Sequence, residues 1–247
     1  MDRMIYTAAA GAARALEQQS VISNNLANVS TAGFREQVAA YRAVPVQGLP
    51  GLPTRVSTIA STPGSGMGQG AMMETGKATD LAIAGEGWFS VQARDGEAYT
   101  RAGDFSINAQ GLLVTRQGLP VLSEDGAPVE IPERGALTFS GDGQITVLGA
   151  GDRPNDLQAL GRLKLVNPPA ADMRRGDDGL FRMAQGQAAP ADAQVRLVAG
   201  FIEKSNVSPA SAMVGLIANA RQFDMQMKVI QDAGANAERA NSILAVV

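Results

Sequence analysis

The residues of this chain that could carry chemistry are its carboxylates, because the sequence contains no Cys and no His. That absence removes thiol chemistry, disulfides, the commonest zinc ligands and the usual base at neutral pH. The acidic residues that stand out, Asp177-Asp178, Glu124-Asp125 and Asp142, all lie beside glycines in predicted turns. Asp in such turns commonly accepts hydrogen bonds from its own backbone, whereas a glycoside hydrolase needs two carboxylates that converge across a cleft. Nothing in the spacing indicates that convergence, so we expect no catalytic site.

Two further segments have a composition that is typical of ligand-binding loops, but not the required spacing. The glycine-rich stretch Gly64–Gly70 does not have the G-x-G-x-x-G spacing of a dinucleotide-binding loop, and no predicted strand or helix flanks it. The segment that begins at Asp142 places Arg153 at the twelfth position, where a calcium loop requires Glu. We therefore expect no cofactor and no metal site.

Composition restricts the partners. The 247 residues are 45% hydrophobic, which is enough for a core in one or two domains. Aromatic residues make up only 4%, so we expect no ring-lined pocket and no small-molecule substrate. A formal net charge of -3, without any block of Lys or Arg, argues against a nucleic-acid partner.

A long helix is predicted at the N-terminus. Small and apolar residues recur there at alternating spacings of four and three, which is typical of a heptad-like seam. Such an Ala-rich seam buries little area per contact, so this helix needs several neighbours. The seam consists of Met1, Ile5, Ala8, Ala12, Ala15, Gln19, Ile22, Leu26 and Val29.

A second helix is predicted at the C-terminus, with Ser208 as N-cap and Pro209 at its first position. It spans about 35 residues, or roughly 50 Å, which a β-domain with its own core cannot cover. We therefore expect it to be covered by other helices. Two heptad series form its predicted seam: Met213, Ala220, Met227, Gly234 and Asn241, and Leu216, Phe223, Ile230, Ala237 and Leu244.

The region between the helices changes character at about residue 81. From 36 to 80, Pro and Gly interrupt any regular period, which predicts an extended linker with one hairpin at most. From 81 to 204, apolar residues alternate and turn dipeptides recur every 8 to 12 residues, which predicts an antiparallel β-domain, sandwich-like or irregularly barrel-like. The predicted strands are Trp88–Gln92, Ala98–Arg101, Phe105–Asn108, Leu112–Arg116, Pro128–Ile131, Gln144–Leu148, Arg162–Val166, Leu180–Met183 and Val195–Ile202.

The predicted fold class is therefore α+β. The terminal segments, residues 1–35 and 205–247, are expected to pair into a coiled-coil-like layer, with the linker and the all-β domain between them in sequence.

Stretches at both ends and in the middle of the chain resemble a known family. They are similar to the signatures of the axial proteins of the bacterial flagellum, the rod and hook subunits, and among these they most resemble the proximal-rod type. The stretches are Asn25–Arg35, Asp80–Val91, Tyr99–Val114, Glu203–Pro209 and Met213–Lys228, with further likeness in Met1–Thr7, Tyr41–Val46 and Gly161–Val166.

The resemblance implies a structural subunit of the rod, the drive shaft that crosses the periplasm, and not an enzyme. It implies partners among other rod subunits, copies of the same chain and the flagellar export apparatus. It also implies that the chain is exported with its N-terminus uncleaved, and Met1–Gly11 has no apolar core long enough for a signal peptide.

The terminal segments should then form the assembly interface around the export channel. Where the first helix stops, Gly33 is expected to adopt a positive φ and Phe34 to fold back as an apolar plug. The expected interface residues are Ile5, Leu16, Ile22, Asn24, Asn25, Leu26, Asn28, Val29, Gly33, Phe34, Met213, Leu216, Ile217, Ala220, Phe223, Met227, Ile230 and Leu244.

Other functions stay open on sequence alone. A distal-rod or hook-type subunit of the same family is the near alternative. A wall hydrolase would need convergent acids in the β-domain, and a binding module would need termini that pack onto that domain. Circular dichroism distinguishes these classes, since an enzyme or module should show its full helix content as a dilute monomer and a rod subunit should not.

Overall fold

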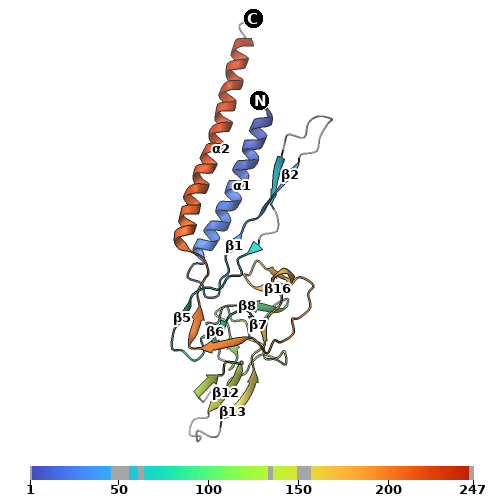
Figure 1. Cartoon of the computed structure of the whole chain (residues 1–247), viewed down its shortest axis with the longest axis vertical. Coiled ribbons are helices and arrows are strands. Elements are labelled where there is room, and N and C mark those ends of the chain that lie inside the picture. Colours follow the sequence, from blue (N-terminus) through green and yellow to red (C-terminus); the bar gives the residue numbers. More distant parts are fainter. Residues whose placement is uncertain (1, 46–55, 61–63, 133–135, 149–156, 245–247) are drawn as a thin grey trace. The chain divides into compact units, whose positions relative to one another are not determined.

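The computed structural model describes residues 2–45, 56–60, 64–132, 136–148 and 157–244. It has two terminal α-helices and a central region of antiparallel strands, so the predicted α+β class is confirmed (Figure 1). The chain forms two compact units. The helix unit contains Met1–Asn28, Glu36–Gly66 and Val207–Val247, and the β unit contains Val29–Arg35 and Met67–Asn206.

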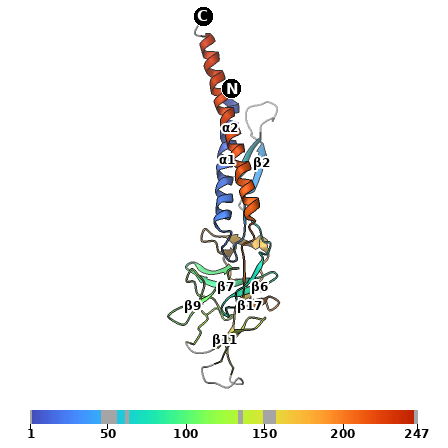
Figure 2. The same ribbon diagram turned by 90° about the vertical axis from the view of Figure 1, so that its left-hand side faces the viewer.

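In the helix unit, helix α1 (Asp2–Ala27) lies beside helix α2 (Pro209–Leu244), as both views show (Figures 1 and 2). The pair is antiparallel, because positions later in α1 contact positions earlier in α2. A Cβ on Gly11 would lie 3.0 Å from the Gln226 side chain, and a Cβ on Gly215 would lie 3.4 Å from Ile22. Glycine at these positions lets the neighbouring side chain approach the helix backbone.

Two short antiparallel pairs complete the helix unit. Strand β2 (Tyr41–Pro45) pairs with β3 (Val56–Ala60), and β1 (Gln37–Val38) pairs with β4 (Gly64–Ser65). The Asn25 side chain ties α1 to β1, since it donates to the Gln37 carbonyl and accepts from the Gln37 amide, both at 2.8 Å. The predicted linker, residues 36–80, is therefore divided between the two units. Residues 36–66 belong to the helix unit, and residues 67–80 belong to the β unit.

The strands of the β unit are short, and every described pairing is antiparallel. The largest sheet has five strands in the order β14-β7-β8-β16-β15. A three-stranded sheet, β11-β12-β13, and the pairs β17-β6, β18-β5 and β10-β9 accompany it. The strands are β5 Met72–Glu74, β6 Leu81–Ala84, β7 Trp88–Ala93, β8 Gly96–Thr100, β9 Ser106–Ile107, β10 Leu113–Val114, β11 Ala136–Phe139, β12 Gln144–Leu148, β13 Gln158–Arg162, β14 Leu165–Val166, β15 Met173–Arg175, β16 Phe181–Met183, β17 Arg196–Ala199 and β18 Phe201–Glu203, with a 3₁₀ turn η1 at Ala170–Asp172.

The period of two in β7 separates two apolar cores. Phe89 and Val91 contribute to the larger core and are fully buried, and the Phe89 ring meets Phe105 edge to face at 5.1 Å. Trp88 belongs to the smaller core, where its ring packs tilted against Phe181 at 4.5 Å. Successive side chains of a strand point to opposite faces, so this one strand anchors both cores.

The observed strands include several that were not predicted, among them β6, β11 and β15, and one predicted strand did not form. Strand β6 was not predicted, because Leu81, Ala82 and Ile83 are all fully buried and the segment has no polar face. Residues Pro128–Ile131 were predicted as a strand but form only isolated bridges, to Leu122 and Leu112. Proline cannot donate to a ladder, which limits pairing there.

The positive φ predicted for Gly33 is confirmed, but the helix ends before Val29 and not at Gly33 as expected. The helix ends at Ala27, and after a turn Gly33 has a φ of 65°. Phe34 is buried at 8% exposure, as expected for an apolar plug. A Cβ on Gly33 would lie 2.2 Å from the carbonyl carbon of Arg101 and from the amide of Ala102. Glycine is therefore required here both by the positive φ and by the close approach of another backbone segment.

We predict that Gly33→Ala destabilises the β unit by at least twice as much as Gly118→Ala. Both glycines have a positive φ, 65° and 80°, but a Cβ on Gly118 meets nothing within 4 Å. Gly118→Ala should therefore cost about 1 kcal/mol of strain alone, and Gly33→Ala adds the backbone collision. Urea unfolding followed by the fluorescence of Trp88, the single Trp, measures both. Equal losses in the two variants would contradict this interpretation.

Candidate assembly interface

Small residues fill the contact between the two helices. Ala8, Ala12 and Ala15 of α1 are buried, and on α2 so are Ala212 and Ala233. One polar group is enclosed with them: Asn219, 3% exposed, donates from Nδ2 to the Ala15 carbonyl at 2.7 Å, and its Oδ1 has no hydrogen-bond partner. A single buried amide among alanines favours one register of the helix pair over its alternatives.

The two heptad series expected on α2 differ in how far they are covered. Leu216, Phe223 and Ile230 are half-buried, on the side of the helix that carries Ala212 and Asn219. Met213 is 54% exposed and Met227 36%, so both are less covered than the residues of the other series. The buried positions Ala212, Asn219 and Ala233 each precede a member of the expected series by one residue. The side chains of Leu244 and Met1 lie outside the described residues.

The outer side of α2 carries an apolar stripe. Ile217 is 56% exposed, Val214 67% and Met225 61%. Together with Met213, Ala220 and Met227, these residues form what we call the outer stripe. From residue 221 onward exposed polar residues lie among the apolar ones, at Arg221, Gln222, Asp224 and Lys228. Beyond Ile230 the exposed positions are mainly polar, at Gln231, Asp232, Asn236 and Glu238.

The remaining expected interface residues lie in or just after α1. Leu16 is 54% exposed, and Ile5, Ile22, Leu26 and Val29 are half-buried. Of the Asn residues, Asn24 is exposed, Asn28 donates to the Asn24 carbonyl at 2.9 Å, and Asn25 is buried against β1. Gly33 and Phe34 are buried within the β unit.

The β unit contains a buried ion cluster that the sequence did not reveal. Glu203 is fully buried and accepts from Nη1 of Arg35 at 2.6 Å and from the amide of Gly70 at 2.8 Å, both on Oε1. Its Oε2 lies 3.2 Å from Nη1 of Arg101. The two guanidinium carbons lie 5.8 and 5.7 Å from the ring centroid of Trp88, within cation–π range. These four residues come from four of the stretches that resemble the axial proteins, but they are too far apart in sequence for spacing to pair them.

Arg101 keeps its charge at neutral pH although it is buried. Burial lowers the pKa of Arg101 to about 10, which leaves the guanidinium protonated near neutrality. Arg101 also donates to the carbonyls of Ile83 and Gly85, and Arg175 donates to the Arg35 carbonyl at 2.7 Å. Because the Arg101 guanidinium stays protonated near neutral pH, it does not act as an acid or base there. Its hydrogen bonds instead position chain segments.

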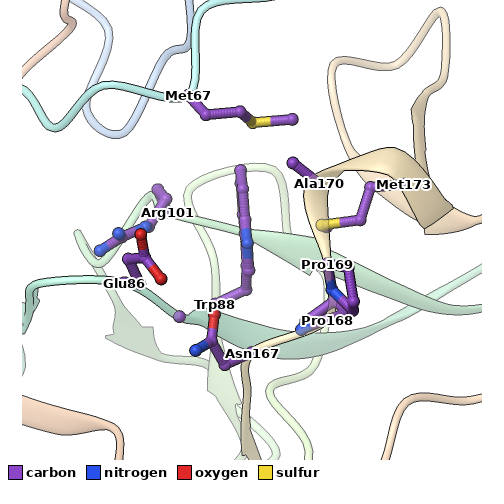
Figure 3. Close-up of a pocket in the computed structure, with 10 residues that line it drawn as sticks. Met67, Glu86, Trp88, Arg101, Asn167, Pro168, Pro169, Ala170 and Met173 are labelled. Carbon is purple, nitrogen blue, oxygen red and sulfur yellow. The ribbon is translucent and has the colours of Figure 1, made fainter.

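A cavity of about 240 Å³ adjoins this cluster. Figure 3 shows Trp88 between Arg101 and Glu86 on one side and Met173 on the other, with Met67 facing the ring. The lining is mainly apolar and includes Pro168 and Pro169.

The turn carboxylates are held by neighbouring groups, as predicted for capping residues. Asp178 accepts from the Leu180 amide at 3.1 Å and from both Nη atoms of Arg182, and this pairing lowers the pKa of Asp178. Asp142 accepts from the Ser140 hydroxyl, which lowers its pKa, and from Arg162 at 2.9 Å. Among the described residues, no three acidic side chains lie together as metal ligands. Neither α1 nor α2, as far as each is described, is long and apolar enough to cross a membrane.

We predict that Arg182→Gln raises the pKa of Asp178 toward 3.8, its ordinary value. A carboxyl whose pKa is lowered in the folded state contributes stability above its unfolded pKa, and this contribution is lost as the pH falls through the folded value. The variant should therefore lose less stability on acidification below about pH 4. NMR titration of the Asp178 carboxyl carbon measures the shift, with Asp142 as the internal reference. An unchanged Asp178 pKa would refute the pairing.

Three parts of the chain match known protein families. Residues 5–35 match the family described as "Flagella basal body rod protein". Residues 82–147 match "Flagellar hook protein FlgE/F/G D1 domain", and residues 198–243 match "Flagellar basal body rod FlgEFG protein C-terminal".

Curated relatives match over the whole length. The "Flagellar basal-body rod protein FlgF" of Salmonella typhimurium and that of Escherichia coli are each 46% identical over 253 residues, covering 100% of both chains. The "Flagellar basal-body rod protein FlgG" of Bacillus subtilis is 30% identical over 251 residues, covering 93% of this chain and 94% of the relative. The chain is thus more similar to these FlgF proteins than to this FlgG protein.

Proposed function

Because this chain belongs to the FlgE/F/G family of flagellar basal-body rod proteins, we propose that its terminal helices build the proximal part of the rod. It is a structural subunit of the basal-body rod and not an enzyme. The observation that carries the proposed assembly is the outer stripe of α2, an apolar surface that its own helix unit leaves exposed. The stripe's occupant is a helix of a neighbouring rod subunit or of another copy.

The stripe provides a substantial driving force for association. Fully burying a side chain such as Ile217, Val214 or Met225 contributes roughly 1.5–3 kcal/mol. The buried alanines between α1 and α2 contribute much less each. Covering the stripe with neighbouring helices gives a coiled-coil-like layer in which each α2 contacts α1 on one side and another subunit on the other.

The contact between subunits is heterologous, because the stripe of one subunit meets a different surface of the next. Heterologous contacts that do not close generate a continuous helical stack, and this one surrounds the export channel. Close-packed helices deform little under load, which suits a shaft that transmits torque across the periplasm.

The remaining partners follow from the same assembly. The subunit reaches the rod through the flagellar export apparatus, and it keeps its N-terminal segment, because α1 supplies one side of the helix pair. A distal-rod subunit is the second candidate, favoured by the match to FlgG relatives at 30% identity. The 46% identity to FlgF relatives favours the proximal rod.

We predict that Ile217→Asp, Leu216→Asp and Phe223→Asp each abolish swimming in a strain that carries only the variant gene. Ile217→Asp places a charge in the outer stripe, and the other two place one beside α1. Thermal unfolding of the β unit, followed by Trp88 fluorescence, should stay nearly unchanged, because that unit has its own core.

The control is Gln231→Asp, an exposed position beyond the stripe, which should leave swimming normal. Secretion of each variant is measured in parallel, so that a failure of export is distinguished from a failure of assembly. Normal swimming of the secreted Ile217→Asp variant would refute the role of the stripe.

We also predict that the helix unit is largely unfolded in the dilute monomer and folds on assembly. Fixing each residue costs roughly 1–2 kcal/mol, and an Ala-rich helix pair recovers little of this. In hydrogen exchange, amides from Ala212 to Leu244 should exchange within seconds, while those of Trp88–Val91 and Leu113–Val114 stay protected. Strong protection of α2 in a verified monomer would show that the intrachain pair is sufficient.

A further inference from the structure

The chain passes between the two units four times, and the crossings are close to the buried ion cluster in sequence. The crossings follow Asn28, Arg35, Gly66 and Asn206. Arg35 is itself a member of the cluster, and Glu203 lies three residues before the last crossing. The β unit therefore holds its buried charges where the chain enters and leaves it.

Backbone hydrogen bonds join these entering and leaving segments within the β unit. The Gly33 amide donates to the Glu203 carbonyl at 2.7 Å, and the Asn206 amide donates to the Phe34 carbonyl at 3.3 Å. The Asn206 side chain donates to the Gly68 carbonyl at 2.9 Å. The segments 33–35, 68–70 and 203–206 are thus linked to one another as well as to the cluster.

We propose that Arg35 and Glu203 act as a latch that seats the segment after α1 and the segment before α2 in the β unit only when both are present. The two residues are 168 positions apart in sequence, and both side chains are 0% exposed. A buried charge that loses its partner is strongly destabilising. Without Glu203, the buried guanidinium groups of Arg35 and Arg101 both lose their carboxylate. Without the segment that carries Arg35, residues 203–206 lose one of two ion pairs and two backbone hydrogen bonds, so each segment is held less stably while the other is absent.

The latch differs from a general stabilising contact in which parts of the β unit are destabilised when it is lost. The guanidinium groups of the cluster lie against Trp88, which belongs to the smaller core and not to the larger core built around Phe89, Leu113 and Val121. Opening the latch should therefore release the linked segments while this core stays closed. The inference does not rest on the proposed assembly, since it concerns one chain in solution.

The test is hydrogen exchange of the full-length Glu203→Gln and Arg35→Met variants. Amides of residues 33–35, 68–71 and 203–206 should lose protection by at least about 100-fold relative to the unsubstituted chain, because a broken buried ion pair costs that much or more. Amides of Leu113 and Val121 should change by less than about 10-fold. The effect should be reciprocal: Arg35→Met should release residues 203–206, and Glu203→Gln should release residues 33–35.

The matched control is Glu97→Gln, which breaks the Lys164–Glu97 pair, with side chains 11% and 14% exposed, inside the β unit. This variant should leave the linked segments protected. Loss of protection spread evenly over the core and the linked segments would overturn the latch, since it would show only general destabilisation. Release of one segment without the other would overturn it as well. If Arg35→Met does not fold, Glu203→Gln decides alone, and continued protection of residues 33–35 in that variant overturns the proposal.

Discussion

A single buried carboxylate, that of Glu203, holds together the parts of the β unit that adjoin the helices in sequence. It is fully buried between two arginines, and it also accepts a backbone amide. Two cations and one anion do not balance, and the Trp88 ring lies against both guanidinium groups. This arrangement is stable only because every segment that contributes to it is in place. Gly33 and Phe34 are hydrogen-bonded to the same segment, at Glu203 and Asn206.

The two units reach stability in different ways. The β unit buries large side chains such as Phe89, Leu113 and Ile145 in a closed core. The helix unit encloses mainly alanines and leaves Ile217 and Met225 exposed. In the assembly that we propose, neighbouring subunits cover this surface, which would be costly in an isolated chain. That proposal assigns assembly to the helix unit, which has the smaller enclosed core of the two.

The expected site on α2 shows why a periodic pattern does not identify a contact. Met213 and Ala212 differ by one position, and both belong to acceptable heptad series. The sequence pattern favoured Met213 as the contact residue. The residue buried against α1 is Ala212 instead, because closely packed helices require small side chains. The apolar residues left over form the outer stripe. Periodicity detects that a helix has apolar faces, but which face meets which partner depends on the partner.

The sequence by itself determined the elements whose causes are local. These include the two helices, the turns with Asp and Gly, the positive φ of Gly33 and the antiparallel β region, as well as the resemblance that led to the family. Only the tertiary structure decided the placement of residues 36–66 with the helices, the buried strand β6, and the cluster of Arg35, Arg101 and Glu203 on Trp88. The physical reason is distance along the chain. A buried ion pair between residues 168 positions apart leaves no local pattern, because its energy arises only when the fold removes both charges from water.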